Sequence, residues 1–516
     1  MTFQGEGQLG WFFWRAAAEY SDKTALIDIS QDEPRKYSFR DLDDAMNRVA
    51  SMLQNTGLKP GDRVGLAISN RAEFLMTMFG AMRAGLVPVP INLKQSKEVL
   101  AYILADSGAK AAIIEPAAGT HITDAAADIP LKFAFGEEPE GWLPFWESVE
   151  SSSTHFEPLE ISPNAPAFHP YTSGSTGRPK GVILTHLNTT WLIETRQKYW
   201  PAKPDQRGLI AAPLYHKNAM TVAFKPKIRA GGSVVLMKNF DARNYLQAIH
   251  DWKVTEAGGV PTMFSMLLKQ QDLIKQLDFS SLQMLRLGSA PAHAELMREI
   301  ARVFNCPSAQ GYGLTETAGG CMSPPLDGRP TPPSSVGTIM PGTEVKLVGT
   351  DGKESNQIGE FWIKSPANSP GYHNLPKVNA ERFVEGWLRT GDILSKDKNG
   401  FFYFEGRIDD MFICGGENIY PKEVENILLK HPAVIQAVVM PHSHPTKGTC
   451  PVAAVVINKS EVTEKDLKDF TLKNGPAYAH PRRILVKDTL PMTGVNKVDL
   501  QQIKTELDQL ELENSS

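Results

Sequence analysis

The chain has 516 residues, with 54 basic and 58 acidic side chains and a formal net charge of −4. One hydrophobic core rarely serves more than about 250–300 residues, so at least two domains are expected. The near balance of charge gives no electrostatic case for nucleic acid or an anionic membrane as the main partner. Hydrophobic residues make up 41% and charged residues 22%, a composition that argues against disorder over most of the length.

The cysteines and the apolar runs bear on the compartment. The four cysteines are scattered singly, without the CxxC spacing of a zinc or redox site and without the density of a disulfide framework. The first residues lack a basic start followed by a long apolar run, so no signal peptide is expected. No apolar stretch of roughly 18 residues occurs, so no transmembrane helix is expected. These features predict a cytoplasmic protein.

The first predicted elements alternate between strands and helices. Residues 39–56 carry apolar side chains at helical spacing, with Ser38 as a candidate N-cap and Gly57 as a terminal stop. Further elements follow in order, namely a strand at 63–69, a helix at 73–85 and strands at 87–93 and 109–116. This alternation predicts parallel strands joined by crossover helices.

The alternation resumes between residues 165 and 310 and then changes twice. Strands are predicted at 182–186, 208–214, 232–237, 256–260 and 284–290. Between 336 and 406, short alternating runs separated by Asp-Gly and Asn-Gly turns favour a small antiparallel barrel or sheet. Beyond this region a helix at 420–434, strands at 437–441 and 452–457 and a helix at 464–474 are predicted, before a fraying polar end at 506–516. We place a domain boundary at Asp409, separating residues 1–408 from 409–516.

The strongest local motif spans residues 171–181, Tyr-Thr-Ser-Gly-Ser-Thr-Gly-Arg-Pro-Lys-Gly. Glycines allow backbone N–H groups to approach an anion closely, the hydroxyls add donors, and Lys180 adds positive charge. This chemistry suits a polyphosphate, although a glycine-rich loop alone is as often a plain surface loop. The motif is not a Walker A loop, because the frame around Lys180 is wrong.

This motif resembles the phosphate loop of the adenylate-forming superfamily, which includes acyl-CoA synthetases, aryl-CoA ligases, luciferases and peptide-synthetase adenylation domains. Five further matches follow in the family's order, at residues 287–291, 310–317, 390–392 with 406–407, 415–421 and 490–497. The resemblance implies an α/β fold: a large N-terminal domain with two doubly wound α/β sheets and a small β-barrel-like subdomain, followed by a small mobile α+β C-terminal domain.

The resemblance also assigns binding residues. It implies that ATP is bound by Thr172, Ser173, Gly174, Ser175, Thr176, Gly177, Lys180, Gly288, Ser289, Ala290, Pro291, Gly311, Tyr312, Gly313, Leu314, Thr315, Glu316, Asp392, Arg407 and Lys497. Among these, Asp392 and Arg407 suit a ribose, since a carboxylate accepts hydrogen bonds from both hydroxyls. Tyr312 offers a ring for adenine, and Thr315 a donor to the α-phosphate. Glu316 is the expected Mg²⁺ ligand.

The implied reaction has two steps. A carboxylic acid attacks the α-phosphorus of ATP with loss of pyrophosphate, and coenzyme A then takes the acyl group. Lys497 is implied as the adenylation lysine, with Thr315, Glu316 and His216 as further catalytic residues. One departure is that Asn496 replaces the usual glycine before this lysine. Between the steps the C-terminal domain rotates about Asp409, and Gly415 and Gly416 line the tunnel for coenzyme A.

The acyl pocket is inferred from residues next to the nucleotide motifs. Its expected walls are His216, Asn218, Val260, Met263, Gly288, Gly313, Ala318 and Cys321. The segment 222–229 departs from the apolar helix usual in the family, because Lys225, Lys227 and Arg229 interrupt it and Pro226 would disturb it. A solvated face is the favoured explanation, and a second anionic group that meets Lys225 or Arg229 is the alternative.

Other functions stay open on the sequence. The acceptor could be a carrier-protein thiol or oxygen instead of coenzyme A, and an inactive nucleotide-binding scaffold is the alternative from another class. A peripheral membrane role rests on the aromatic run at residues 12–14 alone, which is expected to be buried. The sequence does not identify the acid, because pockets that differ by one methylene discriminate by only about 1–3 kcal/mol. It also leaves the oligomeric state open, homodimers being common among relatives.

Overall fold

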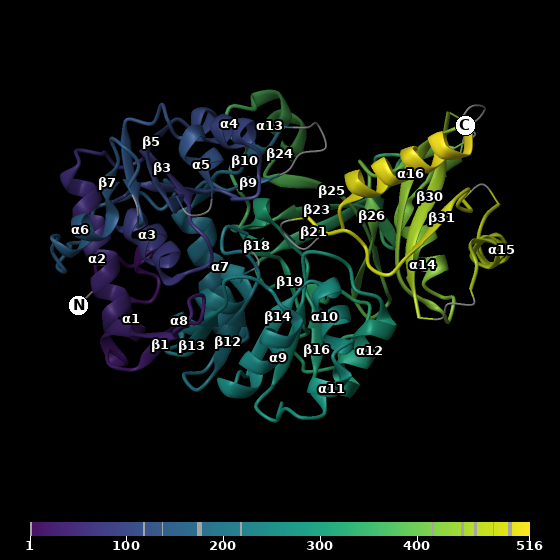
Figure 1. Ribbon diagram of the computed structural model, residues 1–516, viewed down its shortest axis with the longest axis horizontal. Coiled ribbons are helices and arrows are strands. Elements are labelled where there is room, and N and C mark those ends of the chain that lie inside the picture. Colours follow the sequence, from purple (N-terminus) through teal and green to yellow (C-terminus); the bar gives the residue numbers. More distant parts are fainter. Residues whose placement is uncertain are drawn as a thin grey trace.

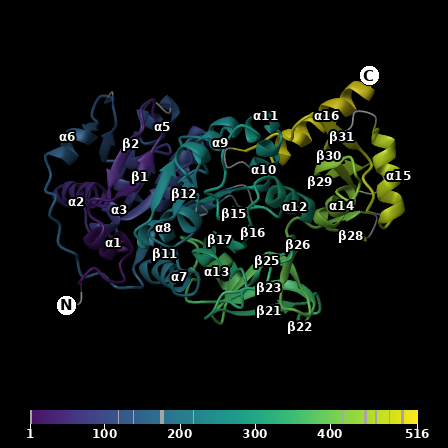
Figure 2. The same ribbon diagram turned by 90° about the horizontal axis from the view of Figure 1, so that it is seen from below.

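The computed structural model describes residues 3–116, 119–136, 138–172, 178–216, 219–414, 417–444, 448–458, 462–477, 479–493 and 498–515. Figures 1 and 2 show a broad body, coloured purple to green, and a smaller lobe at one side, coloured yellow-green to yellow. None of the described helices is both long and apolar enough to cross a bilayer. Phe12 and Phe13 are buried in the body, at 6% and 0% exposure, as expected for the aromatic run.

The first sheet confirms the strand–helix alternation predicted for residues 38–116. Its described strands are all parallel, in the order β4-β3-β5-β6-β7. They are β3 (Arg63–Ala67), β4 (Val87–Pro90), β5 (Ala109–Ile114), β6 (Leu131–Ala134) and β7 (Leu143–Pro144). Parallel neighbours need crossover connections, and helices α3 (Ala72–Arg83) and α4 (Lys97–Ser107) supply them.

Helix α2 (Phe39–Asn55) begins where the sequence predicts, because Ser38 caps it. The Ser38 hydroxyl accepts a hydrogen bond from the Asp41 N–H at 3.1 Å, and the Asp41 carboxylate accepts one from the Ser38 N–H at 2.7 Å. This reciprocal pair satisfies two N–H groups that the helix cannot bond internally. The predicted apolar face is buried and comprises Phe39, Leu42, Met46, Val49, Met52 and Leu53. Gly57 follows the helix with φ of +84°, as expected of a terminal glycine.

The second sheet joins distant parts of the chain in the order β16-β15-β14-β12-β13-β1-β2. Four predicted strands appear as β12 (Arg207–Ile210), β13 (Ser233–Leu236), β14 (Glu256–Gly259) and β15 (Met284–Leu287), and β16 (Ser308–Gln310) is a further strand that was not predicted. Two strands from the start of the chain complete it. β1 (Thr24–Asp28) pairs in parallel with β13, and β2 (Arg35–Ser38) pairs antiparallel with β1. The hydrophobic pattern of residues 24–38 does not indicate which sheet they join.

One predicted strand of this sheet is placed wrongly. Residues 182–186 contribute only β11 (Leu184–Thr185), which pairs with β8 (Pro166–Phe168) in a separate ribbon. The strand ends early because the Thr185 side chain accepts a hydrogen bond from the Asn188 N–H at 3.2 Å. Thr185 therefore caps helix α7 (His186–Tyr199), and the chain leaves the extended conformation there.

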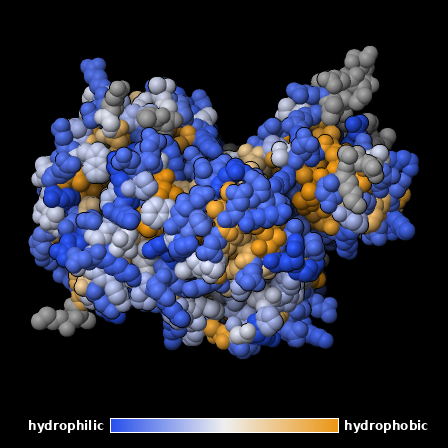
Figure 3. Space-filling view, turned by 60° about the horizontal axis from the view of Figure 1, so that its bottom comes forward, coloured by the Kyte–Doolittle hydropathy of each residue, from blue (hydrophilic) through white to orange (hydrophobic). Residues whose placement is uncertain are grey.

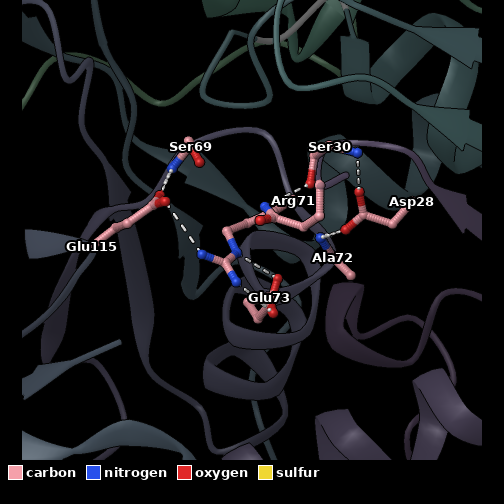
Figure 4. A network of polar contacts seen from close by, with 8 residues as sticks. Asp28, Ser30, Ser69, Arg71, Ala72, Glu73 and Glu115 are labelled. Atoms are coloured by element: carbon pink, nitrogen blue, oxygen red, sulfur yellow. Dashed lines mark hydrogen bonds and ion pairs between the residues drawn. The ribbon is translucent and has the colours of Figure 1, made fainter. Parts of the chain in front are cut away.

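A polar network joins the two sheets (Figure 4). Asp28, at the end of β1, accepts a hydrogen bond from the Ala72 N–H at 2.7 Å and so caps α3 of the first sheet. Arg71 pairs with Glu73 at 2.7 Å and with Glu115 at 3.2 Å, at the end of β5. Arg71, Glu73 and Glu115 all belong to the first sheet and its helices, so within this network the hydrogen bond between Ala72 and Asp28 is the contact that joins the two sheets.

Residues 344–407 form the predicted antiparallel region. Its described ladders make a sheet in the order β22-β21-β23-β25-β24, with β26 also paired to β25. The strands are β21 (Glu344–Val348), β22 (Glu354–Ser355), β23 (Ile358–Lys364), β24 (Phe383–Val384), β25 (Trp387–Lys396) and β26 (Phe402–Arg407). Phe361 and Leu394 are fully buried beneath the sheet, so its inner face has its own core.

The smaller lobe has a separate core. Strands β29 (Val434–His444), β30 (Gly448–Ile457) and β31 (Ile484–Lys487) form its sheet, with helices α14 (Pro421–Leu428), α15 (Glu464–Asn474) and α16 (Leu500–Ser515) beside it. The prediction of a fraying polar end is wrong for α16. Ile503 and Leu507, one helical turn apart, are 0% and 3% exposed, and this apolar contact holds the helix on the lobe.

Candidate functional site

Two predicted motifs and one predicted wall of the acyl pocket lie at one edge of the second sheet. Val260, Gly288 and Gly311 directly follow β14, β15 and β16, which are neighbouring parallel strands. The Gly288 N–H donates to the Gly259 carbonyl at 3.1 Å, and the Gly311 N–H donates to the Leu287 carbonyl at 3.0 Å. The carboxyl ends of parallel strands are where α/β sheets bind ligands, so these loops share one candidate site.

The loop after β15 holds the predicted adenine segment Ser289, Ala290 and Pro291. Ser289 is exposed and adopts φ of +64°, a left-handed conformation that costs a residue with a side chain about 1–3 kcal/mol. The buried Gln310 side chain accepts a hydrogen bond from the Ala292 N–H and ties this loop to the motif at 310–317. The side chain of Gln310 on the neighbouring strand therefore helps to hold the loop in its strained conformation.

The flanks of the predicted phosphate loop form a short hairpin. In it, β9 (Tyr171–Thr172) pairs antiparallel with β10 (Lys180–Gly181), with Thr172 opposite Lys180. The hairpin brings Lys180 to the base of the loop. The loop residues themselves lie outside the described part of the chain, namely Ser173, Gly174, Ser175, Thr176 and Gly177.

Tyr372 connects Lys180 to Glu316, two predicted site residues far apart in sequence. The Lys180 ammonium lies 5.7 Å from the centre of the Tyr372 ring, and the Tyr372 hydroxyl donates to Glu316 Oε1 at 2.7 Å. Burial and the nearby Glu316 carboxylate raise the pKa of Tyr372, so the hydroxyl keeps its proton and stays a donor. Sequence analysis missed Tyr372, because no spacing rule distinguishes it from a core tyrosine.

Asp392 and Arg407 face each other across the ladder between β25 and β26. Arg407 Nε lies 3.3 Å from Asp392 Oδ1, and the Tyr312 hydroxyl donates to Asp392 Oδ2 at 2.6 Å. Burial raises the pKa of Asp392, against the effect of Arg407, and Glu316 is close enough to raise it further. Oδ1 of this buried carboxylate accepts no hydrogen bond from the described residues. We call Lys180, Tyr372, Glu316, Asp392 and Arg407 the nucleotide cluster.

Thr315 and Glu316 lie in a tight turn that begins after β17 (Gly313–Leu314). β17 pairs with β18 (Gly319–Gly320), and a Cβ at Gly313 would overlap the backbone of Gly320, so only glycine fits there. The Ser369 N–H donates to the Glu316 carbonyl at 2.7 Å and holds the turn in place. The hairpin thus fixes Glu316 between the sheet edge and Tyr372.

The described walls of the predicted acyl pocket surround the same edge. Val260, Met263, Ala318 and Cys321 are 5%, 2%, 0% and 3% exposed, while His216 is partly exposed after β12. Behind them lies a cavity of about 30 Å³ lined by Ala211, Ala219, Ala223, Gly258, Gly259 and Arg286. Small side chains leave this space open. Asn218 lies outside the described residues.

The prediction that the basic segment is a solvated face is wrong for Lys225 and Lys227. Both are buried, at 4% and 3% exposure, at the end of a π-helical turn, η3 (Ala219–Phe224), and in helix α8 (Lys225–Arg229). Pro226 does not break α8, because it occupies the first turn, where no backbone N–H is required. Arg229 pairs with the exposed Glu194 on α7 at 3.0 Å.

Glu256 explains the burial of Lys227. Lys227 Nζ lies 2.9 Å from Glu256 Oε2, and Arg286 Nε lies 2.9 Å from Glu256 Oε1. Burial raises the pKa of Glu256, but the two cations outweigh this and hold its pKa below the usual value. Arg196 is close enough to Arg286 and Glu256 to interact with their charges. We call Arg196, Lys227, Arg286 and Glu256 the cationic cluster.

The residues expected to act from the smaller lobe are described only in part. Asp409 lies in an exposed turn between β26 and β27 (Phe412–Cys414). Lys497, Gly415 and Gly416 lie outside the described residues. In the described part of the chain, no group of three or more His, Cys, Asp or Glu side chains is arranged to hold a metal ion.

Known proteins match nearly the whole chain. Residues 13–373 match the family described as AMP-binding enzyme, and residues 423–497 match the AMP-binding enzyme C-terminal domain. A feruloyl-CoA synthase from Amycolatopsis sp is 33% identical over 470 residues, 89% of this chain and 92% of the relative. A fatty acid–[acyl-carrier-protein] ligase from Streptomyces coeruleorubidus is 30% identical over 483 residues, 92% of each chain.

A solved structure extends this similarity to the fold. An anthranilate CoA ligase in complex with anthranoyl-AMP has a TM-score of 0.86 and 25% identity, and the alignment covers 96% of each chain. The family match spans well over half of the sequence, and two of the motifs, at residues 287–291 and 310–317, follow neighbouring strands at one sheet edge. The chain therefore belongs to the AMP-binding enzyme family of adenylate-forming acyl-CoA synthetases.

Proposed function

We propose that this chain is an acid–thiol ligase that converts a carboxylic acid to its acyl-CoA by way of an acyl-adenylate. The observation that carries this proposal is the nucleotide cluster, in which residues from four distant segments face one another. In the first step a carboxylate oxygen bonds to the α-phosphorus, and the bond to the bridging oxygen breaks as pyrophosphate leaves. In the second step the sulfur of coenzyme A attacks the acyl carbon, AMP leaves, and the thiol proton passes to solvent.

Each member of the nucleotide cluster has a role that fits its contacts. Asp392 would accept hydrogen bonds from the ribose, since its Oδ1 has no hydrogen bond from the described residues. Arg407 would keep that carboxylate ionised beside the ligand. Lys180 and Thr315 would offer donors to the phosphates, so that charge developing on the α-phosphate is neutralised by groups already in position. Tyr312, bound through its hydroxyl to Asp392, would flank the adenine.

Glu316 fits a magnesium ion that is shared with the nucleotide. Mg²⁺ is usually bound by one or two carboxylates together with phosphate oxygens, rather than by a complete protein cage. The Glu316 carboxylate, with one oxygen held by the Tyr372 hydroxyl, suits that mode. When bound, the ion would neutralise phosphate charge. Tyr372 would orient the carboxylate, since its hydroxyl occupies one of the two oxygens.

We further propose that residues 409–516 act as a mobile domain that serves each step in turn. Their own hydrophobic core and the exposed turn at Asp409 support a rigid lobe on a short hinge. Figure 3 shows a notch between the lobe and the body on the face in view. In one orientation Lys497 would reach the α-phosphate, and in the other Gly415 and Gly416 would admit coenzyme A.

An assay of which acid is activated and which acceptor takes the acyl group distinguishes this proposal from its alternatives. The protein with ATP, Mg²⁺ and a panel of carboxylic acids should release pyrophosphate only when an acid is present, and acyl-CoA should appear when coenzyme A is added. Mass spectrometry of the products distinguishes acyl-CoA from acyl-AMP. If acyl-AMP accumulates and coenzyme A does not consume it, a carrier-protein thiol becomes the acceptor to test. Absence of acid-dependent pyrophosphate release across the panel would favour an inactive scaffold.

A further inference from the structure

Arg196 reaches from α7 to the wall of the predicted acyl pocket. A Cβ at Gly320 would overlap Nη2 of Arg196, so the guanidinium lies against the β17–β18 hairpin. It lines a small cavity with Leu192, Thr221, Lys225 and Ala318. Ala318 is a predicted wall of the acyl pocket, and the thiol of Cys321, another predicted wall, is close enough to act on the charge of Arg196. The cation therefore lies beside two predicted walls of the acyl pocket, Ala318 and Cys321.

In the described part of the chain, the cationic cluster holds three cations and one carboxylate. Lys227 and Arg286 already pair with the two oxygens of that carboxylate, Glu256. The Nε–H of Arg196 is shielded from solvent and has no hydrogen-bond partner among the described residues. Burial and the proximity of Arg286 lower the pKa of Arg196 to about 10, a value at which it is still charged at neutral pH. A shielded, charged donor without a partner is costly, so it calls for a ligand that supplies one.

We propose that Arg196 binds a second anionic group of the substrate, so that the acid is a dicarboxylic acid activated at the carboxylate remote from Arg196. This inference rests on the proposed function and names the substrate class for it. The cavity beside Arg196 measures about 10 Å³, room for one water-sized group, so it admits one carboxylate oxygen and no bulky ring. Guanidinium and carboxylate form the strongest type of hydrogen bond available there.

The cluster also explains why the second group must be charged. A purely apolar tail would leave the Nε–H of Arg196 unpaired. A terminal carboxylate would instead offset the excess of cations over Glu256. Sites built to bond a polar group discriminate strongly against analogues that lack it. We therefore expect the enzyme to favour a diacid over the monoacid of the same chain length.

The test compares matched acids of equal length, such as succinate with butanoate and adipate with hexanoate. Acyl-CoA formation is measured as kcat/KM for the unaltered protein and for Arg196→Met. The unaltered protein should favour the diacid of the best pair by at least about tenfold. Arg196→Met should lower this preference by about 10- to 100-fold while turnover of the monoacid is retained. Lys198→Met, an exposed lysine on the same helix, is the matched control and should leave the preference unchanged.

Two further measurements keep the result interpretable. Arg196→Met should melt no lower than the unaltered protein, because it removes an unpaired, poorly solvated charge. Arg196→Lys keeps the charge and should retain part of the preference. A preference for the monoacid in every pair, or an equal loss for both acids in Arg196→Met, would overturn the inference and leave the ligase proposal standing. If no acid of either kind releases pyrophosphate, the ligase proposal fails, and the inference fails with it.

Discussion

The nucleotide cluster and the cationic cluster hold charge in different ways. In the nucleotide cluster Asp392 faces Arg407 at 3.3 Å, and Glu316 takes the Tyr372 hydroxyl at 2.7 Å, so each carboxylate has its own partner. In the cationic cluster one carboxylate, Glu256, serves two cations while a third stands beside them. We propose that the first arrangement binds ATP, the substrate that the proposed reaction requires. The second, assembled from helix and strand side chains, is suited to selecting one acid among many.

The largest effect is expected when the single anion of the cationic cluster is neutralised. Glu256→Gln leaves the buried Lys227 and the partly exposed Arg286 without an opposite charge, and the free energy of unfolding should fall by about 3–5 kcal/mol. Denaturation in urea measures this change. The matched control is Glu194→Gln, which removes the exposed partner of Arg229 and should cost less than about 1 kcal/mol. Equal losses in the two variants would show that the buried cluster is no different from a surface pair.

The second-largest effect is expected in the nucleotide cluster, and it tests whether this cluster acts separately from the cationic cluster. Asp392→Asn removes the charge that bonds Tyr312 and faces Arg407, and we expect kcat/KM for adenylation to fall about 100-fold. The loss should be the same for monoacids and diacids, because this carboxylate acts on the nucleotide. Pyrophosphate release measures it with each acid in turn. A loss confined to diacids would mean that the two clusters do not act separately.

A smaller effect is expected at Tyr372, the residue that sequence analysis missed. Tyr372→Phe keeps the ring beside Lys180 and removes only the hydrogen bond to Glu316. Adenylation should slow about tenfold, with a higher Mg²⁺ requirement, because the Glu316 carboxylate is no longer oriented. Titration of the rate with Mg²⁺ reports this. An unchanged Mg²⁺ dependence would remove the metal role assigned to Glu316.

The smallest effect expected is a pH dependence of stability that comes from Asp392. Burial raises the pKa of Asp392 in the folded protein, so ionised Asp392 lowers stability above that pKa, and this penalty vanishes as the pH falls below the unfolded pKa. Asp392→Asn should therefore melt higher than the unaltered protein at neutral pH, and the difference should shrink on acidification. Thermal melts of both proteins from pH 7 to pH 3 test this. A difference that grows in acid would reverse the sign assigned to this carboxylate.

Much of the fold follows from local sequence signals. The Ser38 cap, the parallel strands of the first sheet and the antiparallel texture near residue 360 all appear where expected. Such features depend on side-chain periodicity and on turn chemistry over a few residues. Contacts between segments that are far apart in the sequence do not follow from such local signals. The attachment of β1 to β13 and the packing of Leu507 depend on partners that no local pattern identifies.

Some residues of the candidate site can likewise be found from sequence, and others only from the fold. Motif residues such as Asp392 and Glu316 are found from sequence because the resemblance assigns them. Tyr372 and Arg196 belong to no assigned motif, and their importance depends on which side chains the fold brings within reach. Lys227 shows the limit most clearly, because its burial depends on Glu256, 29 residues away in the chain. Without knowledge of this partner, the sequence favours an exposed position for the lysine.

The pairing of β1 with β13 has a consequence for biogenesis. Residues 26–28 align with residues 234–236, so the edge of β1 that meets β13 has no partner until some two hundred further residues have left the ribosome, whereas β2 can pair with the other edge much earlier. An unpaired strand edge is exposed to wrong contacts during that interval. The first sheet, by contrast, closes within a continuous stretch and can form early. During synthesis the first sheet can therefore fold before the second sheet, which stays incomplete until β13 has been made.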